Sequence, residues 1–226
     1  MRKFLQNYLL NTAEYFKCCI EAMGTLRKWG NVKATLIAVL IAAPSLANAG
    51  EAPQVVTAVC AGCHGADGKG VAPMFPHLAG QHSVYLKKQI NDFIDGRRKN
   101  DMMSPIVTAL KPEDVNAVAD FYSGQKPVGG NTVDDKLIET GMTFYQDGNS
   151  DTGVPGCVGC HMDEGVGNKI YPRLAGQSSM YISQQLANFK SGARTNDNGS
   201  LMRSVAAKMT EQEMNAVAEY LASLGK

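Results

Sequence analysis

Apolar residues recur at helical spacing in two pairs of matching stretches, each with one apolar face. A period of about 3.6 residues predicts amphipathic helices whose apolar face is buried. No stretch alternates polar and apolar residues as a half-buried strand would, so the pattern predicts an all-α fold. The predicted buried positions are Leu86, Ile90, Phe93 and Ile94, matched by Ile182, Leu186 and Phe189, and Val115, Val118, Ala119 and Tyr122, matched by Met214, Val217, Ala218 and Leu221.

Local signals mark the ends of the predicted helices. Pro112 suits the first turn of the last helix in the first half, where the backbone N–H it lacks has no helical partner. The corresponding helix of the second half begins with a capping box that runs from Thr210 to Glu213. A further short helix is expected near the start of each half, at about 52–62 and about 134–145.

Two blocks of sequence occur twice, which indicates an internal duplication. They are Pro-x-Leu-Ala-Gly-Gln at 76–81 and 172–177, and Asn-Ala-Val-Ala at 116–119 and 215–218. Residues 126–133, between the copies, have the glycine- and proline-containing composition of a linker. We therefore expect two tandem domains of one fold, at 50–125 and 134–226.

The N-terminal part has the features of a secretory signal peptide. Residues 1–33 are basic, residues 34–43 form an apolar run shorter than the ~20 residues of a membrane span, and an Ala-x-Ala sequence ends at Ala49. We expect residues 1–49 to be a signal peptide with an N-terminal extension, cleaved after Ala49. Two alternatives stay open, namely an uncleaved anchor and a start of translation at Met23.

The most specific motif is Cys-x-x-Cys-His, which occurs once in each half and is the attachment signature of c-type haem. Two thiols at this spacing reach the two vinyl groups of one porphyrin, and the adjacent imidazole lies under the iron. The residues are Cys60, Cys63 and His64, and Cys157, Cys160 and His161. A thioredoxin-like pair needs no following histidine, whereas a zinc site built from both copies is the harder alternative to exclude.

All four cysteines after residue 49 belong to these motifs, which leaves no thiol for a disulfide or for an axial thiolate. We therefore expect two covalently bound haem c groups. Domains this small have weak cores by area alone, and a large apolar porphyrin would complete each core.

Haem iron that is bound by histidine on one side either takes a second ligand or keeps an open site, and this choice separates a carrier from a catalyst. Aligning the Asn-Ala-Val-Ala blocks pairs Met103 with Met202, whereas Met102 pairs with Leu201, which cannot bind iron. We predict Met103 and Met202 as the second ligands, with Met102 as the alternative. The other methionines considered are expected to pack: Met74, Met162, Met180, Met209 and Met214.

Further residues are expected near the haems, each with a second interpretation. The carbonyls of Pro76 and Pro172 either accept the other N–H of the ligating histidines or only belong to a rigid turn. Arg98 and Arg194 either pair with haem propionates or are exposed. The remaining residues are Tyr85 and Tyr181, expected near a propionate or in the packing, and His77 and His82, expected at the surface.

Taken together, these motifs resemble those of the dihaem cytochrome c4 family over essentially the whole chain after residue 49. The resemblance implies two class-I-like cytochrome c domains related by pseudo-twofold symmetry, with His/Met-ligated haems whose propionate edges approach across the interface. It also implies a periplasmic carrier, soluble or peripherally attached to a membrane, that takes electrons from a quinol–cytochrome c reductase to a haem–copper terminal oxidase. The match departs after the second motif, where Met162 stands opposite Gly65 and residues 198–200 lengthen the loop before Met202.

Charge adds little to this interpretation. Residues 50–129 are neutral overall and residues 130–226 carry a net charge of −3, a difference that either orients docking or is an ordinary solvated surface. Nothing indicates binding to nucleic acid. We expect an electron carrier rather than an enzyme. A dihaem peroxidase, the alternative, would need one open iron site, and a fixed electron-entry subunit would need an uncleaved anchor.

Overall fold

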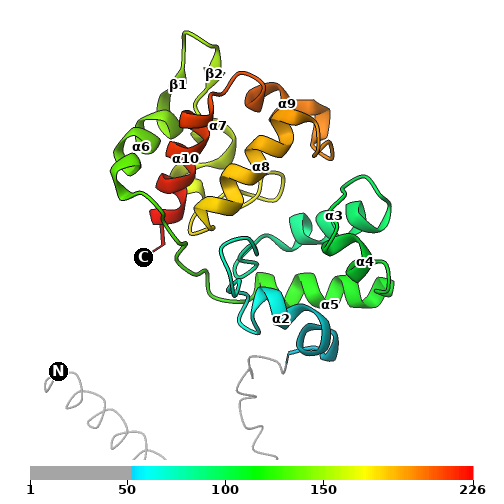
Figure 1. The fold of residues 1–226 in the computed structure, drawn as a ribbon. Coiled ribbons are helices and arrows are strands. Elements are labelled where there is room, and N and C mark those ends of the chain that lie inside the picture. The colour runs from blue at the N-terminus through cyan, green and yellow to red at the C-terminus, as the bar shows by residue number, and fades with distance from the viewer. Residues whose placement is uncertain (1–51, 226) are drawn as a thin grey trace, which may run out of the picture. The chain divides into compact units, whose positions relative to one another are not determined.

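The computed structural model describes residues 52–225, so the predicted signal peptide and its cleavage site lie outside the described residues. Within this range the chain forms two helical domains (Figure 1). In the first domain a short π-helical segment runs directly into a helix that ends at the predicted iron ligand His64. The elements of this domain are η2 (Val56–Cys60), α2 (Ala61–His64), α3 (Ser83–Ile94), α4 (Met103–Val107) and α5 (Pro112–Ser123).

The core of the first domain lies where α3 packs against α4 and α5. The predicted apolar faces of α3 and α5 are confirmed, except that Ile94 is only half-buried. Helix α5 begins at Pro112, as predicted. The buried members of this core are Val56, Leu86, Ile90, Phe93, Val107, Val115, Val118, Ala119 and Tyr122.

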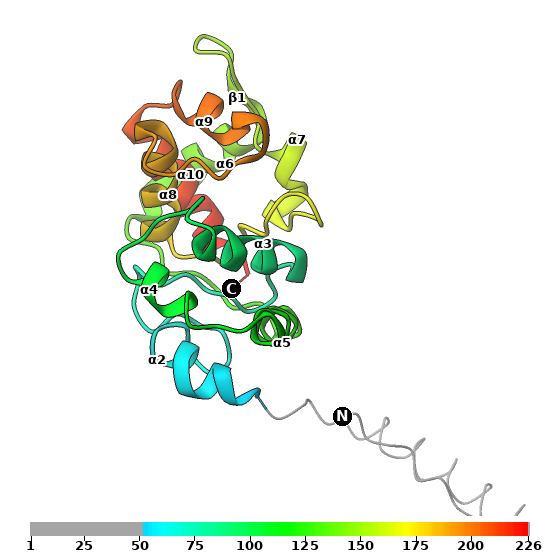
Figure 2. The same ribbon diagram turned by 90° about the vertical axis from the view of Figure 1, so that its right-hand side faces the viewer.

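The second domain repeats this arrangement with a longer entry to its Cys-x-x-Cys-His motif. Its elements are η3 (Asp135–Leu137), α6 (Ile138–Asp147), β1 (Gly148–Asn149), β2 (Val154–Pro155), α7 (Val158–His161), η4 (Asp163–Gly165), α8 (Ser179–Ser191), η5 (Asn198–Ser200), α9 (Leu201–Ala206) and α10 (Glu211–Ser223). Helix α10 packs against both α6 and α8, as Figure 1 and the turned view of Figure 2 show.

The core of the second domain depends on a close approach of α6 to α10. A Cβ atom on Gly141 would lie 1.9 Å from the carbonyl oxygen of Ala216, so only glycine allows this spacing. The predicted capping box begins α10, since the Thr210 hydroxyl accepts a hydrogen bond from the Glu213 N–H at 3.2 Å. The predicted apolar faces of α8 and α10 are confirmed: Ile182, Leu186, Phe189, Met214, Val217, Ala218 and Leu221 are all buried.

A small antiparallel hairpin interrupts the otherwise helical second domain. Strands β1 and β2 pair Gly148 with Pro155 and Asn149 with Val154, so the expectation of no strands is wrong for these residues. The side chain of Asn149 accepts hydrogen bonds from the backbone N–H groups of Asp151 and Thr152 and closes the turn. No helix within residues 52–225 is long and apolar enough to cross a membrane.

Candidate haem-binding sites

Each predicted iron-binding histidine is the last residue of a short helix. His64 ends α2 and His161 ends α7, and both side chains are buried. Their Nδ1 atoms lie 3.0 Å from the carbonyl oxygen of Pro76 and 3.1 Å from that of Pro172. Because a carbonyl oxygen only accepts hydrogen bonds, each Nδ1 carries a proton and Nε2 keeps the lone pair that a metal would need.

The surroundings of the two histidines keep the imidazoles neutral. Burial lowers the pKa of His64 and of His161, although the hydrogen bond to the proline carbonyl partly opposes this effect. An aromatic ring lies near each imidazole, with centroid separations of 6.4 Å for Phe75 and 5.9 Å for Tyr171. We had not predicted these rings, although an aromatic residue directly before the proline in both copies was a usable signal.

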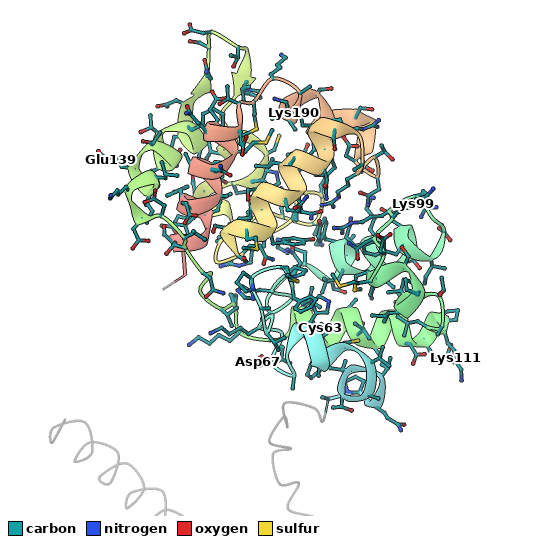
Figure 3. All side chains as sticks on the ribbon, in the orientation of Figure 1. Cys63, Asp67, Lys99, Lys111, Glu139 and Lys190 are labelled. Carbon is teal, nitrogen blue, oxygen red and sulfur yellow. The ribbon has the colours of Figure 1, made fainter. Side chains whose placement is uncertain are left out.

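The motif cysteines lie in, or directly before, the short helix that ends at their histidine (Figure 3 labels Cys63 at α2). Burial raises the pKa of the Cys60 and Cys157 thiols to about 11, so before haem is attached both thiols are protonated at neutral pH. In the part of the chain that the structure describes, no three His, Cys, Asp or Glu side chains gather as a zinc site requires. Two thiols and one neutral imidazole per domain fit a covalently attached haem.

The two predicted methionine ligands occupy matched positions near the cores. Met103 is the first residue of α4 and packs against the first core, and Met202 lies in α9 and packs against the second. Met102, the alternative, is 51% exposed. Of the methionines expected to pack, Met209 and Met214 are buried and Met162 is half-buried, whereas Met74 and Met180 are exposed and that prediction is wrong for them.

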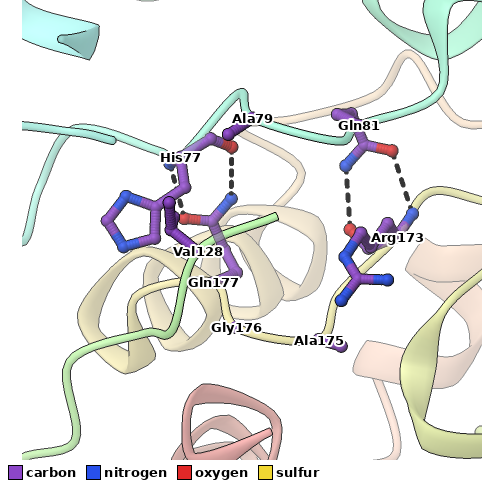
Figure 4. Close-up of a pocket in the computed structure, with 8 residues that line it drawn as sticks. All are labelled: His77, Ala79, Gln81, Val128, Arg173, Ala175, Gly176 and Gln177. Carbon is purple, nitrogen blue, oxygen red and sulfur yellow. Dashed lines mark hydrogen bonds between the residues drawn. The ribbon is translucent and has the colours of Figure 1, made fainter. Parts of the chain in front are cut away.

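Two reciprocal pairs of hydrogen bonds join the domains beside a small cavity (Figure 4). The side chain of Gln177 accepts from the backbone N–H of His77 at 2.8 Å and donates to its carbonyl at 2.9 Å. Gln81 does the same with the backbone of Arg173, at 2.9 and 2.8 Å. Both glutamines end a Pro-x-Leu-Ala-Gly-Gln block, so the duplicated sequence produces a pseudo-twofold joint.

The prediction that His77 and His82 lie at the surface is wrong for His77, which is buried at this joint. Its Nδ1 accepts a hydrogen bond from the Gly70 N–H at 2.9 Å. His82 is half-buried, and its Nε2 lies 3.0 Å from the carbonyl oxygen of Val166 in the other domain. The second domain covers both positions, which the sequence of one domain does not reveal.

Arg98 and Arg194 are buried at the same interface, so the alternative of exposed arginines is wrong. Arg98 donates to the Tyr181 hydroxyl at 2.9 Å, and Arg194 donates to the Tyr85 hydroxyl at 3.1 Å, each across to the other domain. Each guanidinium also stacks on a phenylalanine of its own domain, 4.6 Å from the Phe93 ring centroid and 4.5 Å from that of Phe189. The tyrosines are thus part of the packing between domains.

One charged group breaks the symmetry of this interface. Asp92 is 2% exposed, and its carboxylate accepts hydrogen bonds from Lys88, from Arg97 Nε at 2.8 Å and from Asn196 Nδ2 at 2.6 Å. Lys88 also donates to the carbonyl of Asn196 at 2.7 Å. The repeat pairs Asp92 with Asn188, so the second domain has no such carboxylate.

Two helical domains, each with a Cys-x-x-Cys-His helix and a histidine oriented by a proline carbonyl, define a c-type haem protein with two sites. Comparison with known proteins agrees. The family model for cytochrome c matches residues 49–124 and 138–225. Cytochrome c4 of Azotobacter vinelandii is 40% identical over 185 residues, which cover 76% of this chain and 88% of that protein.

A solved structure of reduced recombinant cytochrome c4 from Pseudomonas stutzeri superposes with a TM-score of 0.71 at 38% identity, covering 77% of this chain and 99% of that one. A thiosulfate dehydrogenase electron acceptor of Stutzerimonas stutzeri is 38% identical over 178 residues, or 74% of this chain and 79% of that protein. The chain therefore belongs to the cytochrome c family and, within it, to the dihaem cytochromes c4. It is an electron-transfer protein with two covalently bound haem c groups, one in each domain.

Proposed function

We propose that this chain is an exported carrier that takes single electrons from a quinol–cytochrome c reductase to a haem–copper terminal oxidase. When bound, each haem supplies one-electron chemistry whose potential depends on its axial ligands. The ligands in this proposal are His64 and Met103 in the first domain, and His161 and Met202 in the second. The observation that carries the proposal is their matched arrangement, with a buried, carbonyl-oriented histidine and a half-buried methionine against each core.

Thioether ligation fits a carrier better than a catalyst. A sulfur ligand raises the reduction potential relative to a second histidine, and it leaves no iron position for a substrate. A protein with two such sites exchanges electrons with little change in geometry. A dihaem peroxidase would instead need one site without its methionine.

Two buried arginines support a haem edge near the domain interface. Within the described residues, the guanidinium groups of Arg98 and Arg194 donate hydrogen bonds only to neutral groups of Gln, Tyr and Asn side chains. Burial alone would lower the pKa of Arg98, but nearby groups that include the buried carboxylate of Asp92 raise it. That carboxylate is already paired with Lys88 and Arg97. A further anionic group close to both guanidiniums would therefore stabilise the interface. The propionates of two haems would supply that charge.

Optical spectra of the holoprotein test the ligand assignment. Two low-spin haems per chain with the sulfur-to-iron band are expected, and no change should follow addition of carbon monoxide or peroxide. Met103→Ala and Met202→Ala should each remove the band from one haem, while Met102→Ala, at the exposed neighbouring position, should leave both unchanged. A high-spin fraction in the wild type would overturn the carrier assignment and reopen the peroxidase alternative.

The export part of the proposal concerns residues 1–49. Haem c is attached outside the cytoplasm, which agrees with a signal peptide cleaved after Ala49 and a periplasmic location. N-terminal sequencing of the purified holoprotein should then begin at Gly50. If the protein is instead found in the membrane fraction and still contains residues 34–43, the result would support the uncleaved anchor.

A second candidate partner is a thiosulfate dehydrogenase, because a relative that is 38% identical carries the name of its electron acceptor. The two candidates differ in the electron donor. Oxidised holoprotein should be reduced by a quinol in the presence of a quinol–cytochrome c reductase. Faster reduction by thiosulfate with thiosulfate dehydrogenase would favour the second candidate.

A further inference from the structure

One fully buried tyrosine in each domain donates a hydrogen bond to the carbonyl that directly follows the haem-motif histidine. The Tyr122 hydroxyl donates to the Gly65 carbonyl at 3.0 Å, and the Tyr145 hydroxyl donates to the Met162 carbonyl at 2.6 Å. Both tyrosines are 0% exposed. Burial raises the pKa of both hydroxyls well above the usual value, so each keeps the proton it donates.

The two tyrosines come from different helices of the repeated fold. Tyr122 lies on α5, the last helix of the first domain, whereas Tyr145 lies on α6, the first long helix of the second. The repeat pairs Tyr122 with Leu221, which is buried and has no hydroxyl. The two domains therefore make the same hydrogen bond with tyrosines at positions that do not correspond in the repeat. The duplication of the sequence alone does not account for this bond.

The accepting carbonyl closes a tight turn. It also accepts from the N–H three residues later, which is Gly68 in the first domain and Gly165 in the second, at 3.2 Å in each. The residue that bears it has a positive φ in both domains, 73° at Gly65 and 65° at Met162. Met162 also has a ψ of 173°, and residues other than glycine rarely adopt this combination of φ and ψ. Contacts from other parts of the domain must therefore hold the turn in place.

The turn continues by hydrogen bonds to the segment that orients the imidazole. The carbonyl of Gly68 accepts from the N–H of Leu78 at 2.8 Å, two residues after Pro76, whose carbonyl accepts from His64. In the second domain the carbonyl of Gly165 accepts from the Leu174 N–H at 2.7 Å. Leu174 follows the carbonyl acceptor of His161 by the same two residues. A continuous series of bonds thus leads from each tyrosine to the carbonyl that fixes its histidine.

We propose that Tyr122 and Tyr145 are positioning residues for the haem histidines, each of which sets the reduction potential of the haem in its own domain. The proposal rests on the histidine ligation of the proposed function. A well-held N–H···O=C bond makes the imidazole a better electron donor and stabilises ferric iron. Loss of the hydroxyl loosens the turn and the proline carbonyl behind it, which weakens that bond.

The test uses Tyr122→Phe and Tyr145→Phe in the full holoprotein, because each substitution removes one oxygen atom and keeps the ring. We expect the potential of the haem in the same domain to shift upward, with its hyperfine-shifted haem methyl resonances displaced, while the other haem is unchanged. Tyr220→Phe is the matched control, since Tyr220 is buried on α10 with its ring centroid 5.4 Å from that of Tyr145. It should leave both potentials unchanged.

Unchanged potentials in both variants, with only a loss of stability, would overturn the proposal, because the tyrosines would then merely satisfy buried hydroxyls within the cores. A shift of the wrong haem, or an equal shift with Tyr220→Phe, would also overturn it. The optical spectrum of the wild type tests the proposed histidine and methionine ligands independently of the tyrosines. If those ligands are wrong, the wild type will show a high-spin haem.

Discussion

Replacing Asp92 by asparagine should destabilise the holoprotein, because Asp92 is a buried carboxylate at the domain interface. The substitution keeps the shape of the side chain, but it removes the negative charge and turns one acceptor into a donor. That new donor would face Asn196 Nδ2, itself a donor now 2.6 Å from the carboxylate, and the Lys88 ammonium group. The repeat shows that asparagine is tolerated at the corresponding position 188, but there it faces no lysine of this kind.

The magnitude follows from the burial of each partner. The bond from Asn196 is buried on both sides, and a hydrogen bond to a charged acceptor in such a place contributes about 1.5–3 kcal/mol. The pair with Lys88, whose side chain is 36% exposed, adds up to about 1 kcal/mol. We therefore expect a loss of about 2–3 kcal/mol at pH 7. At ~2–4 °C per kcal/mol for a protein of this size, the Tm should fall by about 5–10 °C.

The effect should also depend on pH in a defined direction. Burial alone would raise the pKa of Asp92, but hydrogen bonds from Lys88, Asn196 and Arg97 outweigh it and hold that pKa below its usual range. A depressed pKa adds stability that is fully present above the unfolded-state pKa of about 3.9 and is lost as the pH falls through the folded-state value. The free energy of unfolding, measured with denaturant, should thus differ between the wild type and Asp92→Asn by the same amount at pH 7 and pH 5. This difference should shrink below about pH 4.

Asp95→Asn is the matched control for this prediction. Asp95 lies just beyond the same helix and pairs with Arg97 at 2.6 Å, but its side chain is 47% exposed. Its loss should change the free energy of unfolding by less than about 0.5 kcal/mol. Equal losses in the two variants, or a loss in Asp92→Asn that persists unchanged well below pH 4, would refute the reasoning.

Three further predictions concern the joint, the second haem turn and the last helix. Gln81→Ala and Gln177→Ala each leave a backbone N–H and a carbonyl of the other domain unpaired, and should each cost about 1–3 kcal/mol in denaturant unfolding, while Gln184→Ala, at an exposed position, should cost almost nothing. Met162→Gly should be about 1–3 kcal/mol more stable than Met162→Ala, because only glycine relieves the strained φ and ψ; equal stabilities would argue against strain. Thr210→Ala should lower the Tm through loss of about 1 kcal/mol at the capping box, and Thr210→Ser should largely restore it.

Apolar periodicity was enough to predict which helical faces are buried, because the pattern on α3, α5, α8 and α10 reflects packing within one domain. The relation between histidine and proline was also accessible from the sequence, since both copies keep the same block a short distance after the motif. The strands β1 and β2 were not, because two residues are too few to show alternation, and their turn depends on side-chain bonds from Asn149.

What the sequence could not predict arises where two domains or two helices meet. His77 and Arg98 have the polarity of surface residues, and only the second domain buries them. Tyr122 was predicted as a core position, but its hydroxyl contact with Gly65 needs the crossing of α5 over the turn. Tyr145 was a harder case, because no residue of the first copy corresponds to it in this role. An alignment of the two repeats cannot detect a hydrogen bond that each domain makes with a residue at a different position.

The hydrogen bonds that the Gln81 and Gln177 amides make between the domains should depend little on salt concentration or pH. Each bond there links neutral groups, so dissolved salt does not screen it and no proton equilibrium breaks it over the range in which proteins stay folded. The Asp92 cluster at the same domain interface responds to acid, but the amide pairs do not. The hydrogen bonds of Gln81 and Gln177 should therefore contribute the same stability to the joint in brine and in dilute buffer.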